Sequence, residues 1–256
     1  MFFTGNASAA EEIKIGGTGA ALGSMQILAA EFSATNPDIR VTNVPSLGSG
    51  GSIKAVLAGA IGLAVTSRPM KENERKLGAV ETEYARTPFV FAVSTKSKVT
   101  SITSGELADI YAGKSVTWAD GSPVRILLRS ASDIDTEIVR NISPAIGLAL
   151  AAAETRPGVQ FSVNDQDAAN DLERIPGAIG PSSLALIVSE KRTLRALKLD
   201  GREPTPMSAA SGAYPYYKRL FLVTGAKPSV AVERFIAYVH SPAARKILTG
   251  NGQWIP

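Results

Sequence analysis

The first part of the chain alternates short apolar segments with Gly-rich turns and helical patterns, and this alternation constrains the fold more than any other feature. Residues 13–15 predict a strand, residues 16–19 a Gly-rich turn, and the apolar residues that follow are spaced three or four apart, as in a helix. The same order recurs with a strand at 39–44, a loop at 46–52, a second helix and a strand at 61–65. This order builds a parallel sheet with helices on its faces, so we expect an α/β fold.

Two aromatic segments further along the chain predict strands that connect one half of the molecule to the other. Residues 88–93 and 214–223 both combine a proline with aromatic and β-branched residues. Between them we expect a short helix at 104–111 beginning near Ser104, a strand at 124–128, and a long helical region at 135–153.

We therefore expect two lobes joined by two crossover segments, each lobe with a mixed sheet flanked by helices. The predicted divisions are residues 12–87 plus 216–256 for lobe 1, residues 88–215 for lobe 2, and residues 1–11 as a signal-peptide remnant or a disordered terminus. The hinge candidates are Thr87-Pro88 and residues 212–215. Small residues around Ala7-Ser8-Ala9 resemble the end of a secretory signal, which favours export to a periplasm; an accidental match is the alternative.

Composition excludes several classes of function. Hydrophobic residues make up 45% and charged residues 20% of the 256 residues, which is typical of a soluble globular protein. The net charge of +4 is spread along the chain, so a nucleic-acid footprint is not indicated. Without cysteine, and with His240 as the single histidine, the chain offers no thiolate nucleophile, disulfide or His/Cys metal site. We therefore expect no metal and no cofactor.

Three loops share the chemistry of an anion site. Residues 16–19, 46–52 and 129–136 are rich in Gly, Ser or Thr, follow predicted strands and open predicted helices. A helix N-terminus presents unpaired N–H groups and a partial positive charge, and glycine lets a ligand approach the backbone. Hydroxyls in and near these loops, with the guanidinium of Arg129, could donate hydrogen bonds to one oxyanion. Taken singly, each loop is also explained by ordinary turn and capping preferences.

A dinucleotide site is the main alternative. The pattern Gly17-x-Gly19-x-x-x-Gly23 after a strand, with Tyr214 and Lys218 later in the chain, is compatible with an NAD(P)-dependent oxidoreductase of Rossmann type. Two features oppose it. No carboxylate ends the second strand, and the surroundings of Lys218 predict a strand and not a helix. A Ser-His-Asp hydrolase would have to use His240, which lies at the end of a terminal helix.

The order of these motifs resembles the phosphate-binding substrate-binding proteins of ABC importers over nearly the whole chain. The matching pieces are Gly16-Gly17-Thr18-Gly19, Gly48-Ser49-Gly50-Gly51-Ser52-Ile53, Thr66-Ser67-Arg68-Pro69-Met70, Arg129-Ser130, Ala178-Ile179-Gly180, Tyr214-Pro215, and Phe235-Ile236 followed by Ser241 and Gly252. The resemblance implies the two-lobe fold of periplasmic binding proteins of type II, no enzymatic activity, a small oxyanion as ligand with phosphate first among the candidates, ABC permease subunits as partners, and a monomer. A sensor or interaction module with the same fold is the second alternative.

The ligand shell expected from the loops and the resemblance combines donors from both lobes. It consists of Gly17, Thr18, Gly19, Ser49, Gly50, Gly51, Ser52, Ser67, Arg129, Ser130, Ser132, Asp133, Asp135 and Thr136. Two departures from the family matter. Ser67 stands where many phosphate binders have an aspartate, and in the segment after the arginine Ile134 and Asp135 replace the family's glycines, which adds bulk and negative charge. Two unit charges about 4 Å apart repel by about 4 kcal/mol near a protein surface. Either a carboxylate in the cleft accepts a ligand proton, or it points away, or the ligand is not phosphate.

Overall fold

A computed structural model gives the fold, and it describes residues 10–256. The strands are β1 (Glu11–Gly17), β2 (Ile39–Asn43), β3 (Leu63–Thr66), β4 (Val80–Ser94), β5 (Ser101–Ile102), β6 (Arg125–Leu128), β7 (Gln160–Phe161), β8 (Ala178–Ser183), β9 (Leu194–Ala196), β10 (Lys198–Leu199) and β11 (Tyr217–Thr224). The helices are α1 (Gly19–Thr35), α2 (Gly48–Leu57), α3 (Glu72–Arg75), α4 (Ser104–Ala112), α5 (Ile134–Arg140), α6 (Pro144–Glu154), α7 (Asp165–Arg174), α8 (Leu184–Ser189), α9 (Pro206–Ala210), α10 (Val230–Val239) and α11 (Pro242–Gly250). The predicted α/β class is confirmed.

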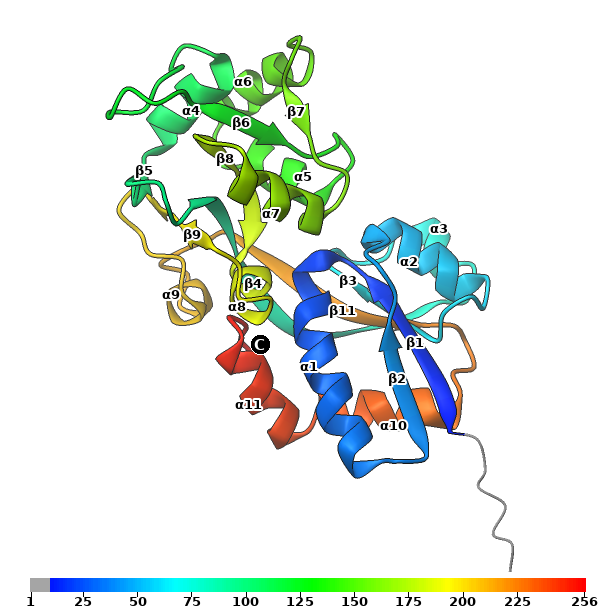
Figure 1. Cartoon of the computed structure of the whole chain (residues 1–256). Helices are drawn as coiled ribbons and strands as arrows, with labels where there is room; N and C mark the ends of the chain where they lie inside the picture. Colours follow the sequence, from blue (N-terminus) through cyan, green and yellow to red (C-terminus); the bar gives the residue numbers. More distant parts are fainter. Residues whose placement is uncertain (1–9) are drawn as a thin grey trace, which may run out of the picture.

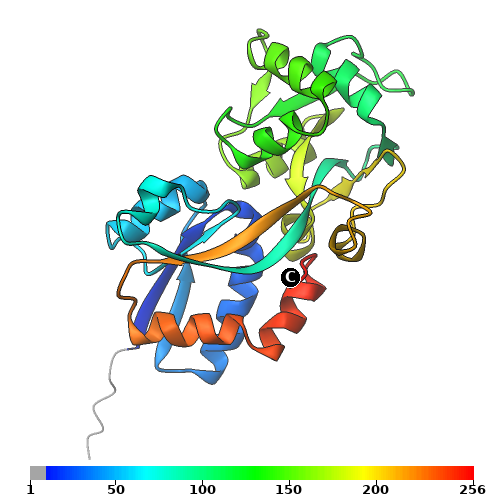
Figure 2. The same ribbon diagram turned by 180° about the vertical axis from the view of Figure 1, so that it is seen from behind.

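One mixed sheet runs through the molecule in the order β2-β1-β3-β11-β4-β8-β6-β7, with β9 paired to β4. The predicted parallel pairing is present at one end, where β1 pairs with β2 and β3, and again where β6 pairs with β7 and β8. In the middle, β11 is antiparallel to β3 and β4, and β4 is antiparallel to β8. Figure 2 shows β4 and β11 running side by side from one half of the molecule to the other.

Separate hydrophobic cores form at the two ends of these crossing strands. One contains Ile15, Met25 and Phe235 and reaches Tyr84 of β4. Another is built around Phe89 of the same strand and packs α4 and α6 against it. Because each core covers one face or end of the sheet, the fold has two lobes (Figure 1). The exact residue bounds of the two lobes stay a prediction.

Several element boundaries differ from the sequence-based expectation. Strand β4 begins at Val80, eight residues before Pro88. The sequence did not predict this first half, because residues 80–87 alternate polar with less polar side chains and carry no apolar run. Helix α2 already starts at Gly48, inside the expected loop. The long helical region divides into α5 and α6, since Ser143 caps a new helix that has Pro144 in its first turn. The cap of α4 is Thr103, one residue before the expected Ser104.

The N-terminal interpretation falls mostly outside the described residues. Glu11 already lies in β1, whereas residues 1–9, on which the signal-peptide interpretation depends, are not described. Within residues 10–256, no helix is both long and apolar enough to span a bilayer. The same residues hold no group of three or more His, Asp or Glu side chains placed to bind a metal ion.

Candidate functional site

Four loops surround a cavity of about 280 Å³ between the N-termini of α1, α2 and α5. They follow β1, β2, β3 and β6, and each stands at the carboxyl end of its strand. The lining residues are Thr18, Leu47, Gly48, Ser49, Gly50, Ser67, Arg68, Lys71, Arg129, Ser130, Ser132, Asp133, Ile134 and Asp165. Ligands in parallel α/β sheets usually bind at this end of the strands, so the cavity is the candidate site.

More than half of the expected ligand shell lines this cavity. Those residues are Thr18, Ser49, Gly50, Ser67, Arg129, Ser130, Ser132 and Asp133. The tertiary structure therefore brings together loops that lie more than a hundred residues apart in the chain. Their role in binding remains a prediction.

The other expected residues do not line the cavity. Gly17 pairs within the sheet, and a Cβ there would lie 2.0 Å from the carbonyl oxygen of Val65. Ser52 and Thr136 are buried, and their hydroxyls donate to the carbonyl oxygens of Ser49 and Arg129.

The remaining three expected residues, Gly19, Gly51 and Asp135, lie near the cavity without lining it. Gly51 is exposed on α2, and the backbone N–H of Gly19 donates to Asp165. Asp135 turns away from the cavity into the protein, where it is 1% exposed and contacts Lys218. Of the two carboxylates left open by the sequence, Asp133 therefore faces the cavity.

Six lining residues were missed from the sequence: Leu47, Gly48, Arg68, Lys71, Ile134 and Asp165. Arg68 directly follows Ser67 and Lys71 comes three residues later, so the charge of the third loop was a usable signal. Asp165 had no comparable signal, because it lies in the first turn of α7 and reaches the site only through the packing of α7 against α1.

Only one of the three helix N-termini at the cavity lacks a side-chain cap. At α1, Asp165 accepts the N–H of Gly19 at 2.9 Å. At α5, Asp133 accepts the N–H of Asp135, also at 2.9 Å. No side chain caps α2, and its first turn has no acidic residue. Its free N–H groups at Gly48, Ser49 and Gly50 are therefore the backbone donors best placed for an external anion.

Hydroxyl groups connect the first three loops in one hydrogen-bonded chain. Ser49 Oγ lies 3.3 Å from Ser67 Oγ and accepts the N–H of Ser67 at 3.0 Å. The hydroxyl of Ser67 donates to Thr18 Oγ1 at 3.2 Å, and Thr18 donates onward to Asp165 at 3.1 Å. The hydroxyl hydrogens of Ser67 and Thr18 are thus used within the protein. Ser49, in the first turn of the uncapped helix α2, has the hydroxyl best placed to donate to a ligand.

Arg129 supplies buried positive charge at the other side of the cavity. Its side chain is 3% exposed, and it donates to the carbonyl oxygen of Ser162 at 2.9 Å and to Asp133 at 2.7 Å. Its Nε has no hydrogen-bond partner among residues 10–256. Burial disfavours the charged guanidinium, but Asp165, Asp133 and Asp135 outweigh it and raise the pKa of Arg129.

The charged side chains that line the cavity are close to balanced. Arg68, Lys71 and Arg129 stand against the carboxylates of Asp133 and Asp165. Arg68 is held in place by Glu74, which accepts from both terminal nitrogens at 2.8 Å and 2.7 Å. The lining thus carries one more positive than negative side chain, and the N-terminus of α2 adds to this field.

Behind the cavity lies a buried ionic cluster. The Nζ of Lys218 is 2.5 Å from Asp135 Oδ1 and 3.1 Å from Asp165 Oδ1, and all three side chains are buried. Burial raises the pKa of Asp135 to about 7, although Lys218 opposes the shift. Burial also acts against ionisation of Asp165, but Lys218, Arg129 and the hydrogen bond from Thr18 hold its pKa at about 2. Asp135 is therefore the carboxylate in this cluster that binds a proton most readily.

The raised pKa of Asp135 predicts a distinct pH dependence of stability. Between its ordinary value of 3.8 and about 7, the folded state holds a proton that the unfolded state has released, so this group's contribution to stability falls as the pH rises through that window. We expect Asp135→Asn to match the native protein near pH 4 and to gain stability relative to it towards pH 8, on the order of a few kcal/mol. Urea unfolding at several pH values measures this difference. A relative loss of stability with rising pH would show instead that the fold favours the ionised carboxylate.

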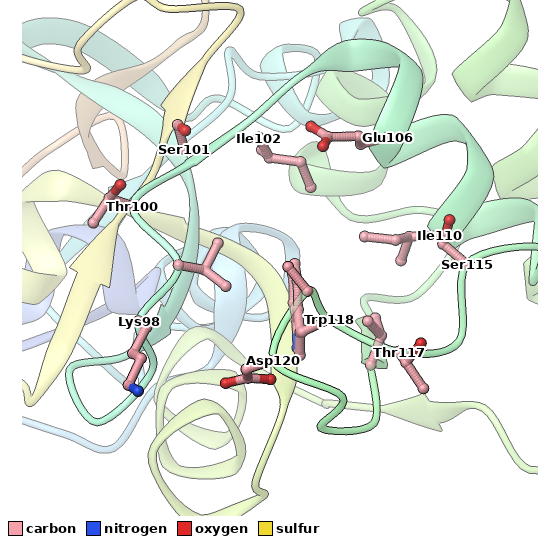
Figure 3. Close-up of a pocket in the computed structure, with 13 residues that line it drawn as sticks. Lys98, Thr100, Ser101, Ile102, Glu106, Ile110, Ser115, Thr117, Trp118 and Asp120 are labelled. Carbon is pink, nitrogen blue, oxygen red and sulfur yellow. The ribbon is translucent and has the colours of Figure 1, made fainter.

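A larger cavity lies elsewhere, among residues 98–124. It measures about 560 Å³, and none of the expected ligand-shell residues lines it. Figure 3 shows Trp118 across the pocket from Ile102 and Glu106. The indole Nε1 of Trp118 donates to the carbonyl oxygen of Gly177 at 3.1 Å, which accounts for its polar atom. Size alone does not make this cavity the functional site, because Lys98 is the one cation in its lining, beside Glu106 and Asp120, and the N-terminus of α4 is already capped by Thr103.

The dinucleotide alternative is not supported by the placement of its residues. Lys218 lies in strand β11 and pairs with buried carboxylates, and Tyr214 donates its hydroxyl to the carbonyl oxygen of Phe89 at 2.9 Å. The two side chains are therefore part of the interior and not one turn apart on a helix. Gly19 packs against α7 and Gly23 against α8, so neither glycine leaves space for a dinucleotide.

Comparisons with known proteins agree with this geometry. The sequence model of the family described as "PBP superfamily domain" matches residues 4–243. The phosphate-binding protein PstS of Bacillus subtilis is 26% identical over 260 residues, covering 98% of this chain and 83% of the relative. A Clostridium perfringens structure with bound phosphate aligns with a TM-score of 0.81 at 21% identity, covering 96% of this chain and 100% of that chain. The periplasmic molybdate-binding protein of Azotobacter vinelandii aligns with a TM-score of 0.67 at 15% identity, covering 95% and 99%. The two structural matches support the two-lobe fold.

Proposed function

Because this chain belongs to the PBP superfamily, we propose that it is an extracytoplasmic solute-binding protein that captures a small oxyanion, with phosphate as the first candidate, for an ABC importer. The observation that carries the proposal is the cavity in which the uncapped N-terminus of α2 faces the buried guanidinium of Arg129. The phosphate-binding relative from Bacillus subtilis, which matches over 98% of this chain, supports the same ligand. We propose binding and transport, not catalysis.

The proposed ligand shell takes donors from both lobes. Backbone N–H groups at Ser49 and Gly50 and the hydroxyl of Ser49 contact the anion from lobe 1. Arg129 and the hydroxyls of Ser130 and Ser132 contact it from lobe 2. An anion held by both lobes stabilises the closed state only by its higher affinity for that state, and this difference is what converts binding into closure.

The two carboxylates at the cavity favour a ligand that carries a proton. An ionised carboxylate can only accept hydrogen bonds, so Asp133 and Asp165 repel a fully ionised oxyanion and can accept from an O–H group. Monohydrogen phosphate has such a group at neutral pH, and sulfate has none. We therefore propose that Asp133, whose side chain is 22% exposed and lines the cavity, supplies the charged acceptor that the neutral hydroxyl of Ser67 does not.

Titration calorimetry with phosphate, sulfate, molybdate and a neutral sugar tests the proposal. We expect phosphate to bind in a 1:1 complex and sulfate to bind at least about 100-fold more weakly, which corresponds to about 2.7 kcal/mol. The neutral sugar is the control for an uncharged ligand and should give no heat of binding. Absence of binding for all three oxyanions would overturn the proposed function, and equal binding of sulfate and phosphate would overturn the role of the carboxylates.

The partner and the compartment belong to the same proposal. ABC permease subunits are the proposed partners, the periplasm or the outer face of the membrane is the proposed location, and a monomer is the proposed state. A permease gene beside the gene for this chain would support transport. A sensor with the same anion site would lack that neighbour.

A further inference from the structure

The glycine pattern on α1 forms a close contact between the lobes. A Cβ at Gly19 would lie 2.2 Å from Gln166 Oε1 and 2.6 Å from the Cβ of Asp165. A Cβ at Gly23 would lie 2.3 Å from Ser189 Oγ. These distances leave no room for a side chain, so the two glycines let α1 of lobe 1 pack directly on α7 and α8 of lobe 2.

Asp165 extends this contact with hydrogen bonds that cross between the lobes. Its Oδ2 accepts from Gly19 N at 2.9 Å and from Thr18 Oγ1 at 3.1 Å, and its Oδ1 accepts from Lys218 Nζ at 3.1 Å. Gly19 and Thr18 belong to the segment predicted as lobe 1 and Lys218 lies on the crossing strand β11, whereas Asp165 begins α7 in the segment predicted as lobe 2. Bonds to a buried ionised group are the stronger class of hydrogen bond, so this contact weighs heavily in how the lobes sit.

The negative charge of Asp165 also reduces the repulsion between two helix N-termini at this contact. The N-termini of α1 and α7 meet here, and each carries a partial positive charge. Two such ends repel each other unless an anion lies between them. The carboxylate of Asp165 lies in the first turn of α7 and caps the first N–H of α1, so it serves both ends at once.

From these contacts we propose that Asp165 and the Gly19–Gly23 face of α1 form a closure latch, an internal anion and a close helix contact that stabilise the closed lobes independently of the bound ligand. The latch explains why the donors of the first loop, expected to hold the ligand, are used by the protein itself. It goes beyond the proposed function, because it concerns the balance between open and closed lobes and not the identity of the anion. Part of the closed-state stability then comes from the chain and not from the solute.

The distance between the lobes in the protein without added ligand tests the latch. The chain has no cysteine, so Leu77→Cys in lobe 1 and Leu148→Cys in lobe 2 accept spin labels at two positions only. Both side chains are well exposed, at 69% and 77%. Pulsed electron resonance then gives the distribution of distances between the labels.

We expect Asp165→Asn and Gly19→Ala each to shift this distribution to longer and broader distances. An asparagine has one acceptor oxygen where Asp165 uses two, and an alanine methyl at Gly19 would overlap Gln166. The matched control is Asp167→Asn, which changes the same residue type in the same turn of α7, where Asp167 accepts from Asn164 within lobe 2. Its distribution should equal that of the labelled native chain.

The outcomes separate the latch from other roles of these residues. Urea unfolding shows whether each variant is folded. If Asp165→Asn does not fold, Gly19→Ala still tests the latch, because this substitution leaves every buried charge in place. Unchanged distances in both folded variants would overturn the proposal, as would an equal shift in the Asp167→Asn control. No anion is added, so the result does not depend on whether phosphate is the ligand.

Discussion

Replacing Arg129 with alanine is expected to weaken phosphate binding by about 2 to 5 kcal/mol, which is a loss of roughly 30-fold to several thousand-fold in affinity. The guanidinium is buried and lines the cavity, while its Nε, which makes no hydrogen bond within the described residues, lies 3.8 Å from Asp135. Its removal also leaves Asp133 at the cavity wall without its partner at 2.7 Å. An approaching anion would then meet an uncompensated carboxylate. Titration calorimetry with phosphate measures the loss.

A matched arginine on the same strand provides the control. Arg125 begins β6 and is exposed, and it donates to the carbonyl oxygen of Pro176, far from the cavity lining. Arg125→Ala should therefore change the affinity less than about threefold, in line with the small effect of exposed charges. If Arg129→Ala is folded and binds phosphate as the native protein does, Arg129 lies outside the ligand shell and the site must be reassigned.

Replacing Lys218 with methionine is expected to cost about 3 to 5 kcal/mol of unfolding free energy. Removing one partner of a buried ionic group leaves the other charges unpaired in a dry interior. Here the ammonium serves two carboxylates, Asp135 at 2.5 Å and Asp165 at 3.1 Å, and none of the three side chains has more than 7% exposure. Urea unfolding at pH 7 to 8, where Asp135 tends to be ionised, should show the largest effect.

The neighbouring residue Arg219 supplies the control for Lys218→Met. Its side chain lies on the opposite, exposed side of β11 and pairs with Glu83. Arg219→Ala should cost no more than about 1 kcal/mol, because exposed ion pairs contribute little. Adding Asp135→Asn to Lys218→Met should recover part of the loss, since it removes one of the unpaired charges. A single variant as stable as the native protein would mean that Lys218 does not hold the cluster together.

The fold was predictable because its signals are local. Strand β1, the glycine turn and helix α1 follow from residue spacing within some twenty residues. Signals that depend on neighbours in space were weaker. The first half of β4 was missed because its polar residues alternate, and its strand character comes from pairing with β11.

The site was predictable in part. Thr18, Ser49, Ser67 and Arg129 line one cavity, because loops after neighbouring parallel strands meet at one edge of the sheet, while their part in binding stays a prediction. The sequence left open whether Asp133 or Asp135 faces the cleft, and the structure turns Asp135 towards Lys218. It gave no means to see that α1 and α5 are capped by carboxylates of the chain itself.

What the sequence by itself determined is the α/β class, the hydroxyl-rich helix starts, and the absence of thiol and histidine-cluster chemistry, since all of these depend on residue types and short spacings. Only the tertiary structure decided which of the helix starts stays open to a ligand. Asp165 meets Thr18 across 147 positions of sequence, and Lys218 meets Asp165 across 53. The physical reason is that capping and ion pairing act over a few ångströms in space, whatever the distance along the chain.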